Sequence, residues 1–186
     1  MRNLCVMHNT MIRISVIVLT VLMFMTSCST SRQGTRAHKK PKSNSATVHY
    51  PHHRTDNNQN LLLLEADTWI GTPYMYGGEQ KGDGADCSGL VMMVYLNALE
   101  MKLPRNSAKQ AEFCDIIEER DVKIGDLVFF ATGRDPEKVS HVGMIVDEEG
   151  TFIHASTKRG VCYSKITDAY YAKRFLMYGR VPGLKK

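Results

Sequence analysis

The distribution of hydrophobic residues divides the chain into three parts. Residues 11–28 contain a basic residue, an apolar run of about a dozen residues and then small residues, which is the pattern of a secretion signal. Residues 29–58 are polar or basic and offer almost nothing to bury, so we expect a disordered tether there. From residue 59 onward hydrophobic residues recur at regular spacing, and the length of this part suits one domain with one core.

Helical spacing dominates the first half of this third part, and short β-rich runs dominate the second half. Helices are expected at 60–70, from 87 to before Pro104, and at 107–114 with Ser107 as the cap. Strands are expected at 127–131, 141–147, 151–155, 161–166 and 175–181, with a helical turn at 168–173. Short turns between neighbouring strands imply antiparallel pairing. The expected fold is therefore α+β, with the helices on one side of an antiparallel sheet.

Cys87 lies at the junction between a turn-rich stretch and an apolar helix. Asp86 before it is a strong N-cap residue, whose carboxylate can accept from the free N–H groups of Ser88 and Gly89. A thiol in the first turn lies at the positive end of the helix dipole, which favours the thiolate. Gly89 would let another segment come close. The thiol also belongs to the apolar stripe of the helix, so its position alone fits a nucleophile or a core residue.

Two histidines on neighbouring strands are candidate partners for this thiol. His141 begins one expected strand, and His154 lies in the next. The short turn between these strands should bring the two imidazoles side by side on one face. A cysteine with two such imidazoles can provide a nucleophile, a base and an orienting group. The same three side chains could instead bind zinc, with a fourth position open to water, and each histidine alone could be structural.

Six ordered motifs resemble those of the NlpC-type cell-wall cysteine peptidases. They are GTPYMYGG at 71–78, DCSGL at 86–90, LPR at 103–105, GDLVFF at 125–130, SHVGM at 140–144 and IHAS at 153–156. The resemblance covers roughly residues 60–182, which is essentially the whole expected domain. No single one of these motifs would be specific, but their order is.

The resemblance implies a papain-like α+β domain that hydrolyses amide bonds in peptidoglycan stem peptides. The bond commonly cleaved in the family joins γ-D-glutamate to a diamino acid such as diaminopimelate. By the same resemblance Cys87 is the nucleophile, His141 the base and His154 the third polar residue. Tyr74 would help the Cys87 N–H to hold the oxyanion, the alternative being a core aromatic. The reaction would pass through a thioester without a metal or other cofactor.

The segment Met25-Thr26-Ser27-Cys28 resembles a bacterial lipoprotein cleavage site. Residues 1–27 would then be the signal peptide, 28–58 a lipidated tether that begins at Cys28, and 59–186 the peptidase domain. We expect a lipid-anchored protein of the cell envelope. Because Ser29 is not acidic, we expect sorting to the outer membrane, facing the periplasm, in a cell with two membranes. The alternative is an ordinary secretory peptide in which Cys28 is incidental.

Charge adds little to the assignment of function. Residues 29–58 have six basic residues and one acidic residue, whereas residues 59–186 have 16 basic and 18 acidic residues. The excess of basic residues therefore belongs to the tether and the signal. It indicates either a tether that contacts anionic lipid or envelope polymer or a solvated spacer, and we expect no nucleic-acid partner. Cys114 and Cys162 are expected to be independent thiols in a monomer, although an exported protein could form a disulfide.

Two other functions remain compatible with the same residues. One is a lipoprotein that binds the wall without cleaving it. The other is an amidase or acyltransferase that uses the same Cys87, His141 and His154 on another acyl donor.

Overall fold

The computed structural model describes residues 57–184, so the predictions for the signal peptide, most of the tether and the lipidation of Cys28 lie outside the described residues. The helices are α2 (Asn57–Asp67), α3 (Cys87–Leu99), α4 (Ser107–Phe113) and α5 (Ala169–Ala172), with a 3-10 turn, η1 (Glu119–Asp121). The strands are β1 (Glu79–Gln80), β2 (Gly84–Ala85), β3 (Asp115–Ile117), β4 (Leu127–Phe130), β5 (His141–Ile145), β6 (Thr151–Ser156), β7 (Gly160–Lys165) and β8 (Phe175–Arg180).

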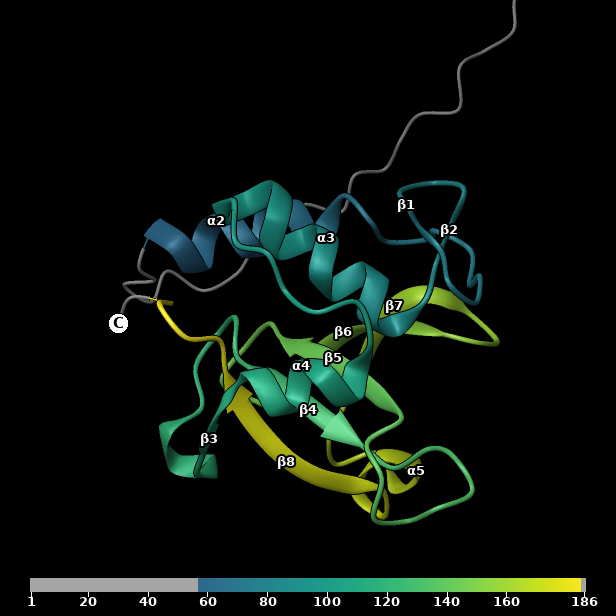
Figure 1. Cartoon of the computed structure of the whole chain (residues 1–186), viewed down its shortest axis with the longest axis vertical. Coiled ribbons are helices and arrows are strands. Elements are labelled where there is room, and N and C mark those ends of the chain that lie inside the picture. Colours follow the sequence, from purple (N-terminus) through teal and green to yellow (C-terminus); the bar gives the residue numbers. More distant parts are fainter. Residues whose placement is uncertain (1–56, 185–186) are drawn as a thin grey trace, which may run out of the picture. The chain divides into compact units, whose positions relative to one another are not determined.

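One antiparallel sheet organises the domain. Its strand order is β3-β8-β4-β5-β6-β7, and β1 and β2 form a separate small hairpin. Figure 1 shows α2 and α3 together on one side of the sheet. The predicted α+β fold with helices on an antiparallel sheet is confirmed. No helix between residues 57 and 184 combines the length and the apolar character needed to cross a bilayer.

Successive side chains of a strand point to opposite faces of the sheet, and in this sheet apolar side chains occupy both faces. The larger core lies against α2 and α3 and includes Trp69, Leu90 and Phe129. The smaller core lies on the other face and includes Phe130 and Phe152. A polar side chain on the second face is therefore surrounded by aromatic rings, on the side of the sheet away from α3.

The predicted cap of α4 is wrong by one residue. Asn106 has the extended backbone of an N-cap, and its side chain accepts from the backbone N–H of Lys109 at 2.9 Å. Ser107 is the first helical residue, so it cannot be the cap, which must keep a non-helical backbone.

Candidate active site

The start of α3 is held by one carboxylate. Oδ1 of Asp86 accepts from the backbone N–H of Gly89 at 2.7 Å and from the hydroxyl of Ser88 at 3.1 Å. Oδ2 of Asp86 accepts from the backbone N–H of Gly77 at 2.9 Å. The predicted cap is confirmed at Gly89, whereas Ser88 contributes its hydroxyl and not its backbone N–H. Cys87 is the first residue of the helix, as predicted.

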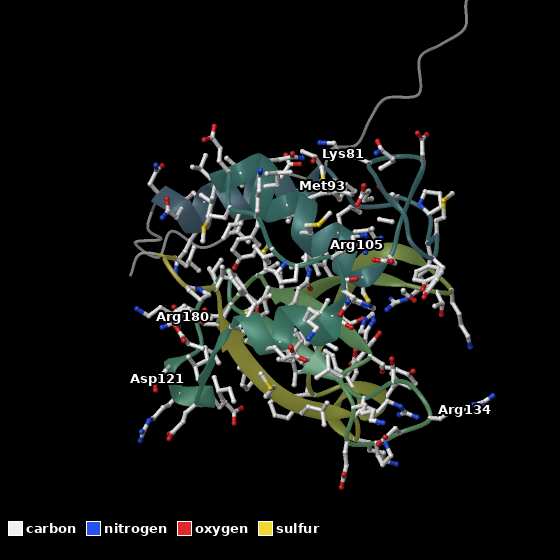
Figure 2. All side chains as sticks on the ribbon, in the orientation of Figure 1. Lys81, Met93, Arg105, Asp121, Arg134 and Arg180 are labelled. Carbon is white, nitrogen blue, oxygen red and sulfur yellow. The ribbon has the colours of Figure 1, made fainter. Side chains whose placement is uncertain are left out.

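Arg105, which is labelled in Figure 2, pairs with the same carboxylate. Its Nη1 and Nη2 donate to Oδ1 and Oδ2 of Asp86 at 2.9 and 3.0 Å, and Nη2 also donates to the carbonyl of Gly78 at 3.2 Å. Burial would raise the pKa of Asp86, but the hydrogen bonds from Arg105 and from the Gly89 N–H hold that pKa below its usual value. The helix start therefore carries a fixed ion pair beside the thiol.

Gly89 lets the loop that contains Gly78 lie directly against the first turn of α3. A Cβ at Gly89 would be 2.2 Å from the carbonyl oxygen of Gly78, which is far inside van der Waals contact. That carbonyl accepts from the backbone N–H of Asp86 at 3.0 Å. The predicted close approach at Gly89 is confirmed, and the approaching segment is the loop before β1.

Cys87 is partly buried and touches the start of β5. The backbone N–H of Val142 is close enough to favour the charged form of the thiol. Tyr74 lies within electrostatic reach, because a charge on Cys87 would raise the pKa of this tyrosine, in addition to the larger effect of burial. Tyr74 pairs with Ala85 in an isolated bridge, which brings it close to the start of the helix.

The protonation state of Cys87 differs from the prediction. Burial raises the pKa of the thiol to about 11, the charge of Asp86 adds to the increase, and the N–H groups of Val142, Ser88 and Cys87 offset it only in part. The helix start does supply favourable N–H groups, but desolvation is the larger effect. The resting form is the thiol, so a nucleophilic Cys87 needs a base.

His141 and His154 are hydrogen-bonded to each other. Nε2 of His141 and Nδ1 of His154 are 3.0 Å apart, and the two rings lie nearly perpendicular, at 85°. The predicted adjacency of the two imidazoles is confirmed. Both rings contact the aromatic side chains of the smaller core, including Phe130, Phe152 and Tyr171.

This face of the sheet is the one away from α3, so the thiol does not approach the histidines across the sheet surface. Cys87 instead reaches β5 at its first residues, where the N–H of Val142 follows directly after His141. Among residues 57–184 the structure has no hydrogen bond between Cys87 and His141. Because Nε2 of His141 is bonded to His154, Nδ1 is the nitrogen left for the thiol.

Both imidazoles are neutral near pH 7. Burial lowers the pKa of His141 to about 4. Burial, the neighbouring His141 and the charge of Arg159 lower the pKa of His154 to about 3. A neutral imidazole can accept a proton, so His141 has the charge state that a general base needs.

Side chains from two further elements surround Nε2 of His154. The hydroxyl oxygens of Ser164 and Tyr171 lie 3.0 and 3.2 Å from it, and the sulfur of Cys162 lies 3.8 Å away. Arg159 donates from Nη2 to the Ser164 oxygen at 2.8 Å. Sequence reasoning missed Arg159, Ser164 and Tyr171 altogether. The pairing of β6 with β7 was the signal that could have pointed to this part of β7, because it places His154 opposite Cys162.

A cavity of about 540 Å³ opens beside the two histidines. Its lining includes His141, His154, Lys158, Arg159 and Asp168, but not Cys87. The cavity therefore reaches the base and its partner from the side of the turn between β6 and β7.

Other candidate chemistry is limited in the described part of the chain. Residues 57–184 contain no group of three or more His, Cys, Asp or Glu side chains placed to hold a metal ion. Cys87, Cys114 and Cys162 are free thiols. Cys114 precedes β3 and Cys162 lies in β7, and these strands are the opposite edges of the sheet, so the two thiols are independent, as predicted.

The sequence model of the NlpC/P60 family matches residues 71–180, which is more than half of the chain. The chain belongs to the NlpC/P60 family. The match runs from the loop of Tyr74 to the end of β8 and includes both histidines. The predicted resemblance is thus confirmed.

Curated relatives and solved structures of this NlpC/P60 domain agree with the match. A protein of Haemophilus influenzae named as a probable endopeptidase is 41% identical over 121 residues, which are 65% of this chain and 73% of that protein. A gamma-DL-glutamyl hydrolase of Bacillus subtilis is 34% identical over 117 residues, which are 61% of this chain but only 27% of that protein. The NlpC/p60 domain of the peptidoglycan hydrolase SagA superposes with a TM-score of 0.57 and 26% identity, over 66% of this chain and 98% of that domain.

The NlpC/P60 match and the superposition confirm the predicted papain-like fold. The relatives named as endopeptidases support a hydrolase of peptidase type. The individual roles of Cys87, His141, His154 and Tyr74 stay predictions, which the geometry above allows us to develop.

Proposed function

We propose that this protein is a cysteine endopeptidase that cleaves peptidoglycan stem peptides at the bond between γ-D-glutamate and a diamino acid. The observation that carries the proposal is the hydrogen bond between His141, at the start of β5, and His154, beside the backbone N–H of Val142 that favours the charged form of the Cys87 thiol. A thiol, a neutral imidazole and a second polar group that orients the imidazole are the parts that a cysteine nucleophile requires.

The first half of the reaction begins with the thiol, because the raised pKa leaves Cys87 protonated. Nδ1 of His141 takes the thiol proton as the sulfur attacks the γ-glutamyl carbonyl carbon. The carbon–nitrogen bond then breaks, and the same proton passes from His141 to the departing amine of the diamino acid. The products of this half are a free amine and a thioester on Cys87.

The second half returns the enzyme to its starting state. Water attacks the thioester carbon and gives a proton to His141. The carbon–sulfur bond breaks, the γ-carboxyl group of D-glutamate is released, and the sulfur takes the proton back from the imidazole. His141 thus serves as base and acid in turn, while His154 keeps its ring in place through the 3.0 Å bond.

The developing oxyanion would be held by the backbone N–H of Cys87 and the hydroxyl of Tyr74. The electrostatic interaction between Tyr74 and Cys87 supports this role, because it requires the hydroxyl to be near the reacting sulfur. A phenol with a raised pKa keeps its proton and remains a hydrogen-bond donor.

The proposed scissile bond and the proposed location of the protein in the cell envelope are supported by different observations. The Bacillus subtilis relative is named for γ-glutamyl hydrolysis, and the superposed domain comes from a peptidoglycan hydrolase. Lipidation of Cys28 and attachment to the outer membrane are proposed from the cleavage-site motif at 25–28 alone. We also propose that the enzyme works as a monomer.

The test is mass spectrometry of defined muropeptides after digestion by the full chain. Wild-type protein should release fragments that end in γ-D-glutamate, and Cys87→Ala should release none while keeping its circular dichroism spectrum. Cys114→Ala is the matched control, since Cys114 is a free thiol away from the histidines, and it should retain cleavage. Cleavage by Cys87→Ala would refute the proposal. Binding without turnover by wild type would indicate a wall-binding protein, and products of another mass an amidase or acyltransferase.

A further inference from the structure

A hydrogen-bonded pair of imidazoles raises the question of which ring holds an added proton. Nε2 of His141 and Nδ1 of His154 share one hydrogen bond, so a proton that enters the pair can reside on either ring. The reaction proposed above works only when the proton taken from Cys87 stays on His141, the ring beside the start of β5. Whatever disfavours charge on His154 therefore assists the chemistry.

The polar groups around the His154 ring come from β5, β7, α5 and the turn between β6 and β7. β5 contributes His141, β7 contributes Cys162 and Ser164, and α5 contributes Tyr171. The turn between β6 and β7 contributes Arg159. Arg159 is the group in this set that carries a charge at neutral pH. Lys158 and Asp168 line the same cavity but have no direct bond to the His154 ring in the described part of the chain.

Arg159 is held where its charge acts on His154. Nη2 donates to the Ser164 oxygen at 2.8 Å, and that oxygen is 3.0 Å from Nε2 of His154. The turn is itself fixed, because the Ser156 hydroxyl accepts from the backbone N–H groups of Lys158 and Arg159 at 3.3 and 3.4 Å. No carboxylate within residues 57–184 forms a direct ion pair with Arg159, although Asp168 lines the same cavity.

We propose that Arg159, acting through Ser164, is a positioning residue that keeps the proton shared by the two histidines on His141. This inference rests on the function proposed above. The guanidinium is separated from His154 by one hydroxyl group and from His141 by the additional width of the His154 ring. Coulomb repulsion falls with distance, so it opposes a positive charge on His154 more than on His141.

The donors and acceptors around Ser164 also favour an arrangement in which His141 takes up the thiol proton. Arg159 can only donate, so the Ser164 oxygen accepts there. The Ser164 hydroxyl is also bonded to Tyr171, where it offsets part of the increase that burial causes in the pKa of that tyrosine. With its proton directed at Tyr171, Ser164 offers its second lone pair to an Nε2–H of His154. Nδ1 of His154 then accepts from His141, which leaves Nδ1 of His141 free for the thiol proton.

The experiment compares Arg159→Met with Arg159→Lys and with Lys158→Met in the full chain. Lys158→Met is the matched control, because it removes a neighbouring positive charge from the same cavity without touching Ser164. Two quantities are measured from about pH 3 to about pH 9, a range that includes the pKa values of both histidines. They are the rate of iodoacetamide alkylation of the Cys87 peptide, followed by mass spectrometry, and kcat and KM for muropeptide cleavage.

In Arg159→Met the histidine pair should protonate more easily, with the charge on His154. The acidic midpoint of kcat/KM should rise by on the order of 1 pH unit. Near pH 7 kcat should fall roughly tenfold with little change in KM, because a proton held on His154 is not available to the departing amine. Alkylation of Cys87 should instead rise, because a histidine pair that protonates more easily is a stronger base for the thiol. Arg159→Lys should reverse most of each change, and Lys158→Met should leave the acidic midpoint in place. Ser164→Ala, which keeps the cation but removes the oxygen that holds it, should shift the midpoint in the same direction.

A wild-type midpoint and alkylation rate in Arg159→Met would overturn the proposal, and so would an equal shift in Lys158→Met, which would point to the general charge of the cavity. Circular dichroism shows whether each variant is folded, and Ser164→Ala provides the decision if Arg159→Met is not. Alkylation needs no substrate turnover. A wild-type protein that cleaves no wall peptide, but whose Cys87 alkylation depends on Arg159, would therefore refute the proposed function and leave this inference standing.

Discussion

Replacing Gly89 by alanine separates the local preference of a helix from its tertiary contacts. In an isolated helix the change stabilises by up to about 1 kcal/mol, since glycine is a poor helix former. In this protein the added Cβ would lie 2.2 Å from the carbonyl oxygen of Gly78. That atom belongs to the backbone, so the loop must move by more than the few tenths of an ångström that a side chain could absorb.

The displaced carbonyl accepts two hydrogen bonds, from the N–H of Asp86 at 3.0 Å and from Nη2 of Arg105 at 3.2 Å. Losing both costs about 2 kcal/mol, and the overpacking adds about 1–3 kcal/mol. After the gain in helix preference, Gly89→Ala should lower the free energy of unfolding by roughly 2–4 kcal/mol, which is on the order of 10 °C in Tm for a domain of this size. The change also shifts the helix start that carries Cys87, so cleavage should fall as well.

Urea unfolding of the full chain followed by circular dichroism measures the effect. Gly133→Ala is the control, because a Cβ there would meet the Ser140 hydroxyl at 3.4 Å, which is an acceptable contact, and its stability should stay within about 0.5 kcal/mol of wild type. If Gly89→Ala is as stable as wild type, or more stable, the contact with the Gly78 loop does not govern this position and the reasoning is wrong.

Three further predictions concern catalysis, the core and pH. Tyr74→Phe should lower kcat roughly 100-fold with KM and stability almost unchanged, and an unaltered kcat would remove Tyr74 from the oxyanion site. Arg180→Met should lower the free energy of unfolding, measured in urea, by about 3–5 kcal/mol. The reason is that the fully buried Asp126 loses the Nε donor at 2.8 Å and the Nη2 donor at 2.6 Å, and a loss below about 1 kcal/mol would contradict this prediction. The pKa values of His141 and His154 in the folded protein lie below that of an unfolded histidine, so the unfolded chain binds more protons as the pH falls. The free energy of unfolding should therefore drop by about 1.5 kcal/mol per histidine between about pH 6.5 and about pH 5. Equal urea midpoints at both pH values would count against neutral buried imidazoles.

The main elements of the fold could be predicted from the sequence because their periodicity is long enough to detect. The helix that starts at Cys87 and the five longer strands lie within one or a few residues of the expected ranges. The strands β1, β2 and β3 have only two or three residues, so no alternation can be recognised in them. The cap of α4 could not be chosen from sequence because Asn106 and Ser107 are both good cap residues, and only the backbone angles distinguish them.

The histidine pair was predictable because a short hairpin fixes which residues are neighbours. The protonation of Cys87 was not, because the burial that raises its pKa comes from segments distant in sequence. Arg159 lies in a turn with no pattern of its own, and Tyr171 lies in the short helix whose presence, but not whose packing, was predicted at 168–173. Their relation to His154 depends on how the turn and α5 pack on the sheet, which no local rule supplies.

Residues 71 and 72 form backbone hydrogen bonds with β7, and this pairing has a consequence for solubility. β7 is an outermost strand of the sheet, and a bare edge of six residues is a template on which another copy could add a strand and start an aggregate. Here the N–H of Gly71 donates to the carbonyl of Val161 at 2.9 Å, and the N–H of Val161 donates to the carbonyl of Thr72 at 2.8 Å. The opposite edge, β3, is only three residues long. The loop that leads to Tyr74 therefore also covers part of one exposed edge, and both edges of the sheet are poor sites for intermolecular β-pairing.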